Sequence, residues 1–140
     1  MSHQLSNNIS IHKEMKVLIV LAHAEPKSLT TTLHNITVEE LEKLGHEVKP
    51  SDLYAMKWKA TIDADDFPEF DKKERLDILT ESGKAYSQGK LSHDILEEQA
   101  KLQWADMVIF QFPMYWFTIP AILKGWFERV YSMEFGCGVG

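Results

Sequence analysis

The sequence predicts an α/β protein with an open, mostly parallel sheet and helices on both faces. Residues 16–22 (KVLIVLA) and 107–112 (MVIFQF) are continuous apolar runs, as expected of strands buried on both faces of a parallel sheet. Apolar residues at helical spacing follow each run, and strands that alternate with helices favour parallel βαβ connections. With 140 residues, the chain forms at most one domain.

The first part of the chain is predicted to form one βαβ unit. Residues 1–15 are polar and are expected to be a disordered leader before a domain at 16–140. A polar turn follows the first strand, and leucines at helical spacing then predict a helix over 28–44, which Gly45 is placed to end. Residues 46–52 are expected to form a short polar strand at an edge of the sheet.

The second part is predicted to add three helices and one strand. Residues 54–71 are irregular and rich in aspartate, a helix is expected from 72 to about 87, and another is expected over 92–103. The apolar run at 107–112 is then the third strand, and a helix begins at Pro120. Because only three strands are visible, the third would lie at an edge, so the domain is expected to be truncated after that strand and its helix.

Composition excludes several classes of function. The net charge of −6 argues against general affinity for nucleic acid or for an anionic membrane. The single cysteine excludes a disulfide framework. No apolar run is long enough to span a bilayer, and no histidine pair has the spacing of a zinc motif. We therefore expect a cytoplasmic protein without membrane insertion, nucleic-acid binding or a metal site.

The turn between the first strand and its helix is a candidate anion site. Unpaired amide N–H groups at a helix start favour a phosphate, and Lys27 adds positive charge there. Hydroxyl donors are available from Ser28, Thr30 and Thr31. The turn carries neither GxGxxG nor GxxxxGK[ST]. A purely structural alternative is commoner, namely that Ser28 only caps the helix and that His23 only ends the strand.

The segment after the third strand is a candidate site for a flat conjugated ring. In open α/β sheets, ligands bind at the carboxyl ends of the strands, and Tyr115, Trp116 and Phe117 follow such an end. The alternative for an aromatic cluster is hydrophobic core. Against that alternative, Pro113 and Pro120 keep the segment from joining either the strand or the helix.

Several strings together carry a resemblance to one family. They are LIVLAHAEPKS, SDLYAM, AYSQGKLSHDILEEQ, WADMVIFQFP and PAILKGW. The chain resembles the NAD(P)H:quinone oxidoreductases (DT-diaphorase and its relatives) over essentially all of residues 16–135. The resemblance implies a flavodoxin-like sheet and a flavoenzyme that passes two electrons from NADH or NADPH through FAD to a quinone. It also implies a homodimer, because the pocket of the family lies between two subunits.

The resemblance assigns roles residue by residue. In the family, the first turn contacts the flavin nucleotide and the aromatic loop approaches the flavin ring. The candidate cofactor-binding residues are therefore His23, Lys27, Ser28, Leu29, Thr30, Pro113, Met114, Tyr115, Trp116 and Phe117. The substrate wall of the family falls at Cys137, Gly138 and Val139. The Tyr/His pair that supports hydride transfer would lie after Gly140, so no catalytic residue is assigned.

Two other functions remain open from the sequence. One is a catalytically silent flavodoxin-like fragment that acts through chain–chain interaction at its open sheet edge or dimer face. The other is a small FMN-binding reductase or electron carrier. The identity of a bound flavin, or its absence, separates the three functions.

Overall fold

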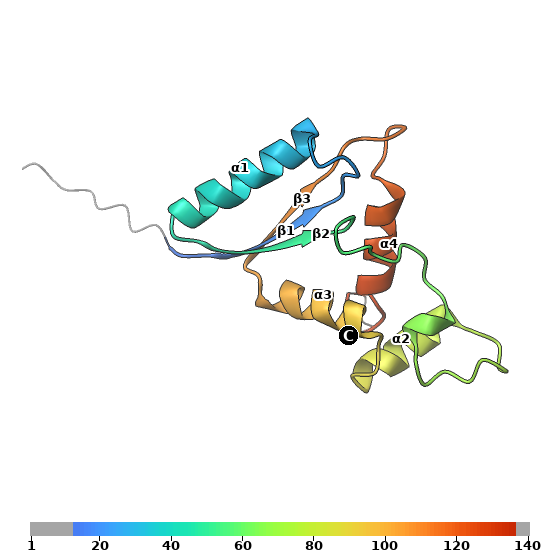
Figure 1. Ribbon diagram of the computed structural model, residues 1–140. Coiled ribbons are helices and arrows are strands. Elements are labelled where there is room, and N and C mark those ends of the chain that lie inside the picture. Colours follow the sequence, from blue (N-terminus) through green and yellow to red (C-terminus); the bar gives the residue numbers. More distant parts are fainter. Residues whose placement is uncertain (1–12, 137–140) are drawn as a thin grey trace, which may run out of the picture.

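A computed structural model describes residues 13–136 of the chain (Figure 1). It contains three strands in one parallel sheet, in the order β2-β1-β3. The strands are β1 (Lys16–Leu21), β2 (Glu47–Asp52) and β3 (Met107–Gln111). The helices are α1 (Leu29–Lys43), the 3₁₀ turn η1 (Ala64–Asp66), α2 (Ile78–Ser87), α3 (His93–Trp104) and α4 (Ala121–Val130).

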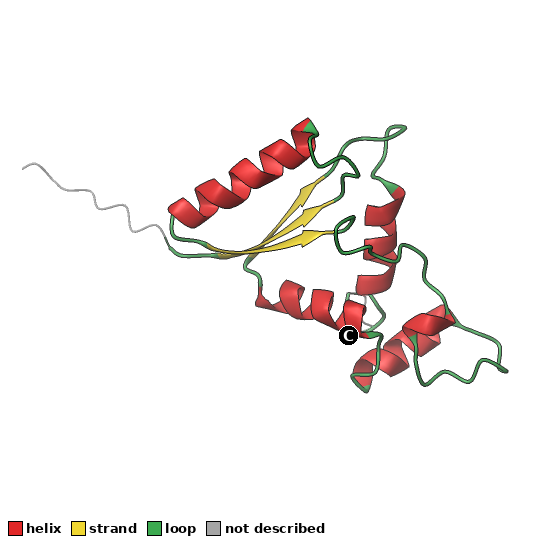
Figure 2. Ribbon diagram, viewed as in Figure 1, coloured by secondary structure: helices red, strands yellow, loops and turns green. Residues whose placement is uncertain are grey.

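The sheet lies between α1 on one face and α3 with α4 on the other (Figure 2). This arrangement confirms the predicted α/β architecture, with β2 and β3 as the edges of the described sheet. The register brings Leu21 opposite both Asp52 and Gln111, so all three strands end together. The loops that follow the three strands therefore all begin at the carboxyl ends of the strands, where ligands bind in open α/β folds.

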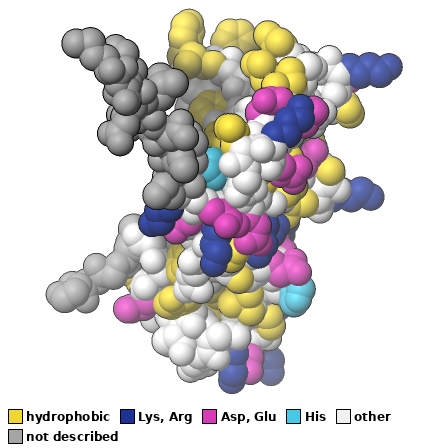
Figure 3. Space-filling model, turned by 90° about the vertical axis from the view of Figure 1, so that its left-hand side faces the viewer, with side chains coloured by type: hydrophobic (Ala, Val, Ile, Leu, Met, Phe, Trp, Pro, Cys, Tyr) yellow, Lys and Arg dark blue, Asp and Glu magenta, His cyan; other side chains and the backbone are white. Residues whose placement is uncertain are grey.

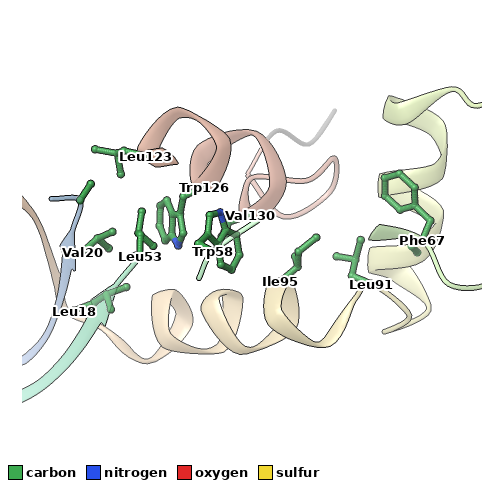
Figure 4. Packing of buried hydrophobic residues seen from close by; sticks show 12 residues of the cluster. Leu18, Val20, Leu53, Trp58, Phe67, Leu91, Ile95, Leu123, Trp126 and Val130 are labelled. Carbon is green, nitrogen blue, oxygen red and sulfur yellow. The ribbon is translucent and has the colours of Figure 1, made fainter. Parts of the chain in front are cut away.

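The main core fills the space between the sheet and α3 and α4 (Figure 4). Leu18 and Val20 of β1 are fully buried there, as is Trp126 of α4. The Trp126 ring meets Phe110 of β3 edge to face, with ring centroids 5.7 Å apart. Its Nε1 donates a hydrogen bond of 2.9 Å to the buried Glu98 carboxylate, so burial of the indole leaves no polar group without a partner.

Gly125 allows α4 to approach the irregular segment before η1. A Cβ at this position would lie 1.9 Å from the backbone oxygen of Ala60, a distance that no side chain tolerates. The glycine of the PAILKGW string is therefore explained by close packing of the helix against backbone. The same helix is fixed further along by a buried arginine.

Arg129 links α4 to η1 through a buried ion pair and to α3 through a second ion pair whose carboxylate is partly exposed. Its guanidinium lies 2.8 Å from Oδ1 of Asp66 and 2.7 Å from Oδ2 of Asp94. It also donates to the backbone oxygen of Lys59 at 2.9 Å and stacks over the Trp58 ring at 4.5 Å. Burial raises the pKa of the Asp94 carboxyl, but hydrogen bonds and the charge of Arg129 outweigh this effect and lower the pKa overall.

One predicted boundary is wrong. The helix expected from residue 72 begins at Ile78, because Asp77 caps it by accepting the amides of Leu79 and Thr80 at 3.1 and 3.2 Å. The segment before Asp77 forms turns instead of a helix. The other predicted strands and helices agree with the structure to within about two residues. Most of the predicted leader, residues 1–12, lies outside the described residues.

The apolar spacing that predicts α1 does not mark the face that contacts the sheet. Leu29, Leu33 and Ile36 form one stripe along the helix, which we call the α1 stripe, and their exposed fractions are 74%, 49% and 50%. The buried side chains of the helix are Thr31 and His34 instead. In Figure 3, hydrophobic side chains gather at the top of the molecule, where α1 and the loop before α4 lie in Figure 1.

Candidate functional site

The turn before α1 presents unpaired backbone donors. Ser28 is the N-cap of the helix, and its Oγ accepts the amide of Thr31 at 3.1 Å. No acceptor among the described residues receives the amide N–H of Leu29 or Thr30. The first turn of the helix contains no acidic side chain. Since the helix dipole favours negative charge at this end, the turn can hold a phosphate.

His23 and Lys27 are the basic residues of the turn. His23 is half-buried, and its Nδ1 accepts the amide of Glu25 at 2.9 Å. In the neutral ring this leaves the proton on Nε2, which is then a hydrogen-bond donor. Lys27 is exposed, and its backbone amide donates to Oε1 of Glu25 at 2.8 Å.

The aromatic segment after β3 is a tight hairpin. Tyr115 and Thr118 exchange two backbone hydrogen bonds of 3.0 Å, and the two residues between them form the turn. Trp116 and Phe117 both have positive φ, at 49° and 66°. This is the pattern of a type I′ turn, which normally uses Asn or Gly. Each aromatic residue held there costs about 1–3 kcal/mol of backbone strain.

The hairpin exposes its rings to solvent. Trp116 and Phe117 are each 93% exposed, and Met114 and Tyr115 are exposed as well. Pro113 is half-buried at the base of the hairpin. The hydrophobic-core alternative does not hold for these rings in the described structure. A strained turn that displays large apolar surface marks a place for a ligand or a partner.

The two loops begin at adjacent, hydrogen-bonded positions. The amide of Ala22, which directly precedes His23, donates to the backbone oxygen of Gln111 at 2.9 Å. A groove of about 200 Å³ then runs between the start of α1 and the end of β3. Its lining residues are Thr30, Leu33, Phe110, Gln111 and Phe112. The structure thus places the turn before α1 and the base of the hairpin side by side at the carboxyl ends of β1 and β3.

Gln111 is a groove residue that sequence reasoning missed. Its Oε1 lies 2.8 Å from Nδ1 of His34, and its Nε2 donates to Oγ1 of Thr37 at 3.1 Å. The two contacts hold the amide rigidly between β3 and α1. The only signal in the sequence is a glutamine inside an otherwise apolar strand, and nothing there indicates its partners 77 and 74 residues away.

A second groove of about 250 Å³ lies on the β2 side of the turn. His23, Pro26 and Thr31 line it together with Asp52 and Tyr54, which sequence reasoning did not assign. The Oδ1 atom of Asp52 accepts the backbone amides that follow it, so one carboxylate oxygen is already used within the loop. The SDLYAM string marks this region in the sequence.

The predicted substrate wall cannot be placed in the structure. Cys137, Gly138 and Val139 lie outside the described residues. Across residues 13–136, no three His, Cys, Asp or Glu side chains are arranged to hold a metal ion. No helix in this part of the chain has the length and apolar character needed to cross a bilayer.

Comparison with known proteins identifies the fold family. A profile described as flavodoxin-like fold matches residues 15–139. The chain belongs to the flavodoxin-like fold family. Its resemblance to quinone oxidoreductases is also confirmed. The chain is 53% identical over 116 residues to NAD(P)H dehydrogenase [quinone] 1 of Rattus norvegicus, and the alignment covers 82% of this chain and 42% of the relative.

Two further proteins to which this flavodoxin-like chain is similar carry related names. It is 60% identical to the ribosyldihydronicotinamide dehydrogenase-like protein traD of Penicillium crustosum over 126 residues, or 90% of this chain and 47% of the relative. A solved structure named as a quinone reductase from Klebsiella pneumoniae is 52% identical with a TM-score of 0.81, over 84% of this chain and 46% of that one. The chain thus spans about half the length of the curated relatives that it matches.

Proposed function

We propose that this chain forms the flavin-holding part of an enzyme that reduces quinones by two electrons at the expense of NADH or NADPH. The observation that carries the proposal is the common origin of the two loops at hydrogen-bonded positions of β1 and β3. One loop offers donors for a phosphate, and the other offers exposed aromatic faces. A dinucleotide with a flat ring, which we take to be FAD, matches both properties.

The residues at the start of α1 are proposed to bind the phosphates of the nucleotide. The amides of Leu29 and Thr30, with Ser28 and Lys27 beside them, hold the phosphates at the start of α1. His23 lines the neighbouring groove, and because its Nδ1 accepts the amide of Glu25, the Nε2 of the neutral ring would be a donor for the nucleotide. These donors are fixed before the ligand arrives, because the cap and the strand pairing already define the backbone there.

The hairpin orients the ring. Pro113 and Met114 lead into the turn, and Tyr115, Trp116 and Phe117 present flat surfaces for stacking. Contact with a ring would also remove exposed aromatic surface of the hairpin from water. When bound, FAD would supply the redox chemistry of hydride uptake and two-electron transfer, and the residues named above would hold and orient it.

The choice of donor and acceptor rests on the relatives. Their names specify NAD(P)H, ribosyldihydronicotinamide and quinone. We extend these names to the present chain as a quinone substrate and a nicotinamide donor. The proposed assembly as a homodimer rests instead on the resemblance of the sequence to the quinone oxidoreductase family. The proposed substrate wall at Cys137, Gly138 and Val139 belongs to the same extension.

The test is a flavin analysis followed by an activity assay on the purified chain. We expect a yellow protein that releases FAD on denaturation and oxidises NADH or NADPH when menadione is added. Release of FMN would overturn the choice of cofactor. A protein that binds no added flavin would contradict the proposal and favour the catalytically silent alternative.

A further inference from the structure

Met114 is the most exposed methionine of the described structure. Its side chain is 71% exposed, against 42% for Met107 and 40% for Met56. Met15 and Met133 are half-buried. Hydrogen peroxide oxidises a thioether directly, and the rate depends on the access of the oxidant to the sulfur. Among these side chains, Met114 should therefore react first.

Met114 lies at the entry to the strained hairpin. Pro113 directly precedes it. Tyr115 follows it and exchanges two backbone hydrogen bonds of 3.0 Å with Thr118. The fixed φ of the proline and the pairing of the hairpin leave the backbone between them little freedom. A chemical change at the Met114 side chain therefore acts at the hairpin itself and is not absorbed by a flexible loop.

The surroundings of Met114 in the sequence suit a thioether better than a sulfoxide. The segment 113–120 (PMYWFTIP) carries no charged side chain, and its aromatic residues are exposed. A thioether makes favourable contacts with aromatic rings, whereas a sulfoxide is polar and is hydrated by water while the hairpin is open. When a flat ligand covers the hairpin, that water must leave, and the sulfoxide oxygen loses its partners at a cost in binding.

We propose that Met114 is a redox-sensitive methionine whose reversible oxidation by hydrogen peroxide weakens the retention of flavin. In this step, the sulfur gives two electrons to the peroxide, one peroxide oxygen becomes the sulfoxide oxygen, and the other leaves as water. Methionine sulfoxide reductases reverse the step with a dithiol, which becomes a disulfide as the oxygen leaves as water. The inference rests on the proposed function, in which Met114 contacts the bound flavin.

The experiment treats the flavin-free 140-residue chain with hydrogen peroxide at a series of doses. Peptide mass spectrometry follows the oxidation of each methionine, and a fluorescence titration measures the affinity for FAD before and after treatment. Met114→Leu removes the sulfur and keeps an apolar side chain of similar volume. Met107→Leu is the matched control, because it removes a less exposed sulfur at the opposite end of β3 from the hairpin.

At the dose that oxidises most of Met114, the wild type and Met107→Leu should lose about tenfold in affinity for FAD. Treatment with the reductases should restore it. In Met114→Leu, the affinity after peroxide should stay within about twofold of its own starting value. Cys137 is present in all three proteins, so oxidation of its thiol does not explain such a difference. Circular dichroism checks that the treated proteins keep their fold.

Two results would overturn the inference alone: oxidation of another described methionine before Met114, or an equal loss of affinity in Met114→Leu. A wild-type chain that binds no FAD before peroxide is added would instead overturn the proposed function, and the inference with it. The two failures are distinguishable, because the second is seen in the untreated protein.

Discussion

Replacing Trp116 by glycine is expected to separate the backbone strain of the hairpin from its affinity for flavin. Trp116 has φ of 49° and is 93% exposed, so its ring contributes almost no burial to the flavin-free fold. Glycine adopts positive φ without strain and should recover about 1–3 kcal/mol. The added freedom of the unfolded chain offsets about 0.4–1 kcal/mol of that gain.

The expected net effect of Trp116→Gly is a free energy of unfolding about 1 kcal/mol higher, and a Tm about 3 °C higher. Trp116→Ala keeps the strained backbone, so its stability should stay within about 0.5 kcal/mol of wild type. Both variants lose the ring and should bind flavin about 1–3 kcal/mol more weakly, which is roughly 5- to 150-fold.

Urea or thermal unfolding of the flavin-free protein measures the first effect, and a flavin fluorescence titration measures the second. Leu79→Ala serves as the control, because it removes another exposed apolar side chain, on α2. Its flavin affinity should not change. The reasoning fails if Trp116→Gly destabilises the free protein by more than about 1 kcal/mol, since the ring would then be packed in the fold. It fails equally if either variant binds flavin as tightly as wild type.

The other predictions concern stability. Ser28→Ala should lower the free energy of unfolding by about 1 kcal/mol in urea titrations, because it removes the N-cap of α1, and an unchanged midpoint would count against the cap. Gly125→Ala should prevent accumulation of folded protein, since its Cβ would lie 1.9 Å from the backbone oxygen of Ala60. A circular dichroism spectrum of the variant equal to that of the wild type would contradict this close packing. Arg129→Met should cost about 3 kcal/mol in the same unfolding assay, because the buried Asp66 carboxylate loses its main partner, and a loss below about 1 kcal/mol would contradict this. The pKa of Asp94 is lower in the folded than in the unfolded protein, so its pairing with Arg129 stabilises the protein above about pH 4, and this stabilisation is lost as the pH falls. In Asp94→Asn, the free energy of unfolding should therefore fall less steeply with decreasing pH in this range. An equally steep fall in the variant would contradict the stabilising role of the pair.

The strands and most helix ends could be predicted from local patterns. Continuous apolar runs marked β1 and β3, while Ser28 and Gly45 marked the two ends of α1 through a side-chain cap and a positive φ of 87°. These signals depend on a few neighbouring residues, which is why the sequence alone suffices for them. The unpaired amides at the start of α1 could be predicted for the same reason, since the first turn of a helix leaves its amides without an intrahelical partner.

The features that could not be predicted depend on distant contacts or on strain. Arg129 pairs with Asp66 across 63 residues, and no local pattern indicates such a pair. For the hairpin, the sequence predicts only a fixed apolar loop, because Trp116 and Phe117 are residues that type I′ turns normally avoid. Places where local preference and structure disagree in this way are often functional.

The affinity ratio between FAD and riboflavin tests the central claim most directly. If the start of α1 holds phosphate while the hairpin holds the ring, FAD should bind at least ten times more tightly than riboflavin in a fluorescence titration. Trp116→Ala should weaken both ligands by a similar factor. Equal affinity for FAD and riboflavin, or binding of neither, would show that the two loops do not grip one flavin nucleotide together.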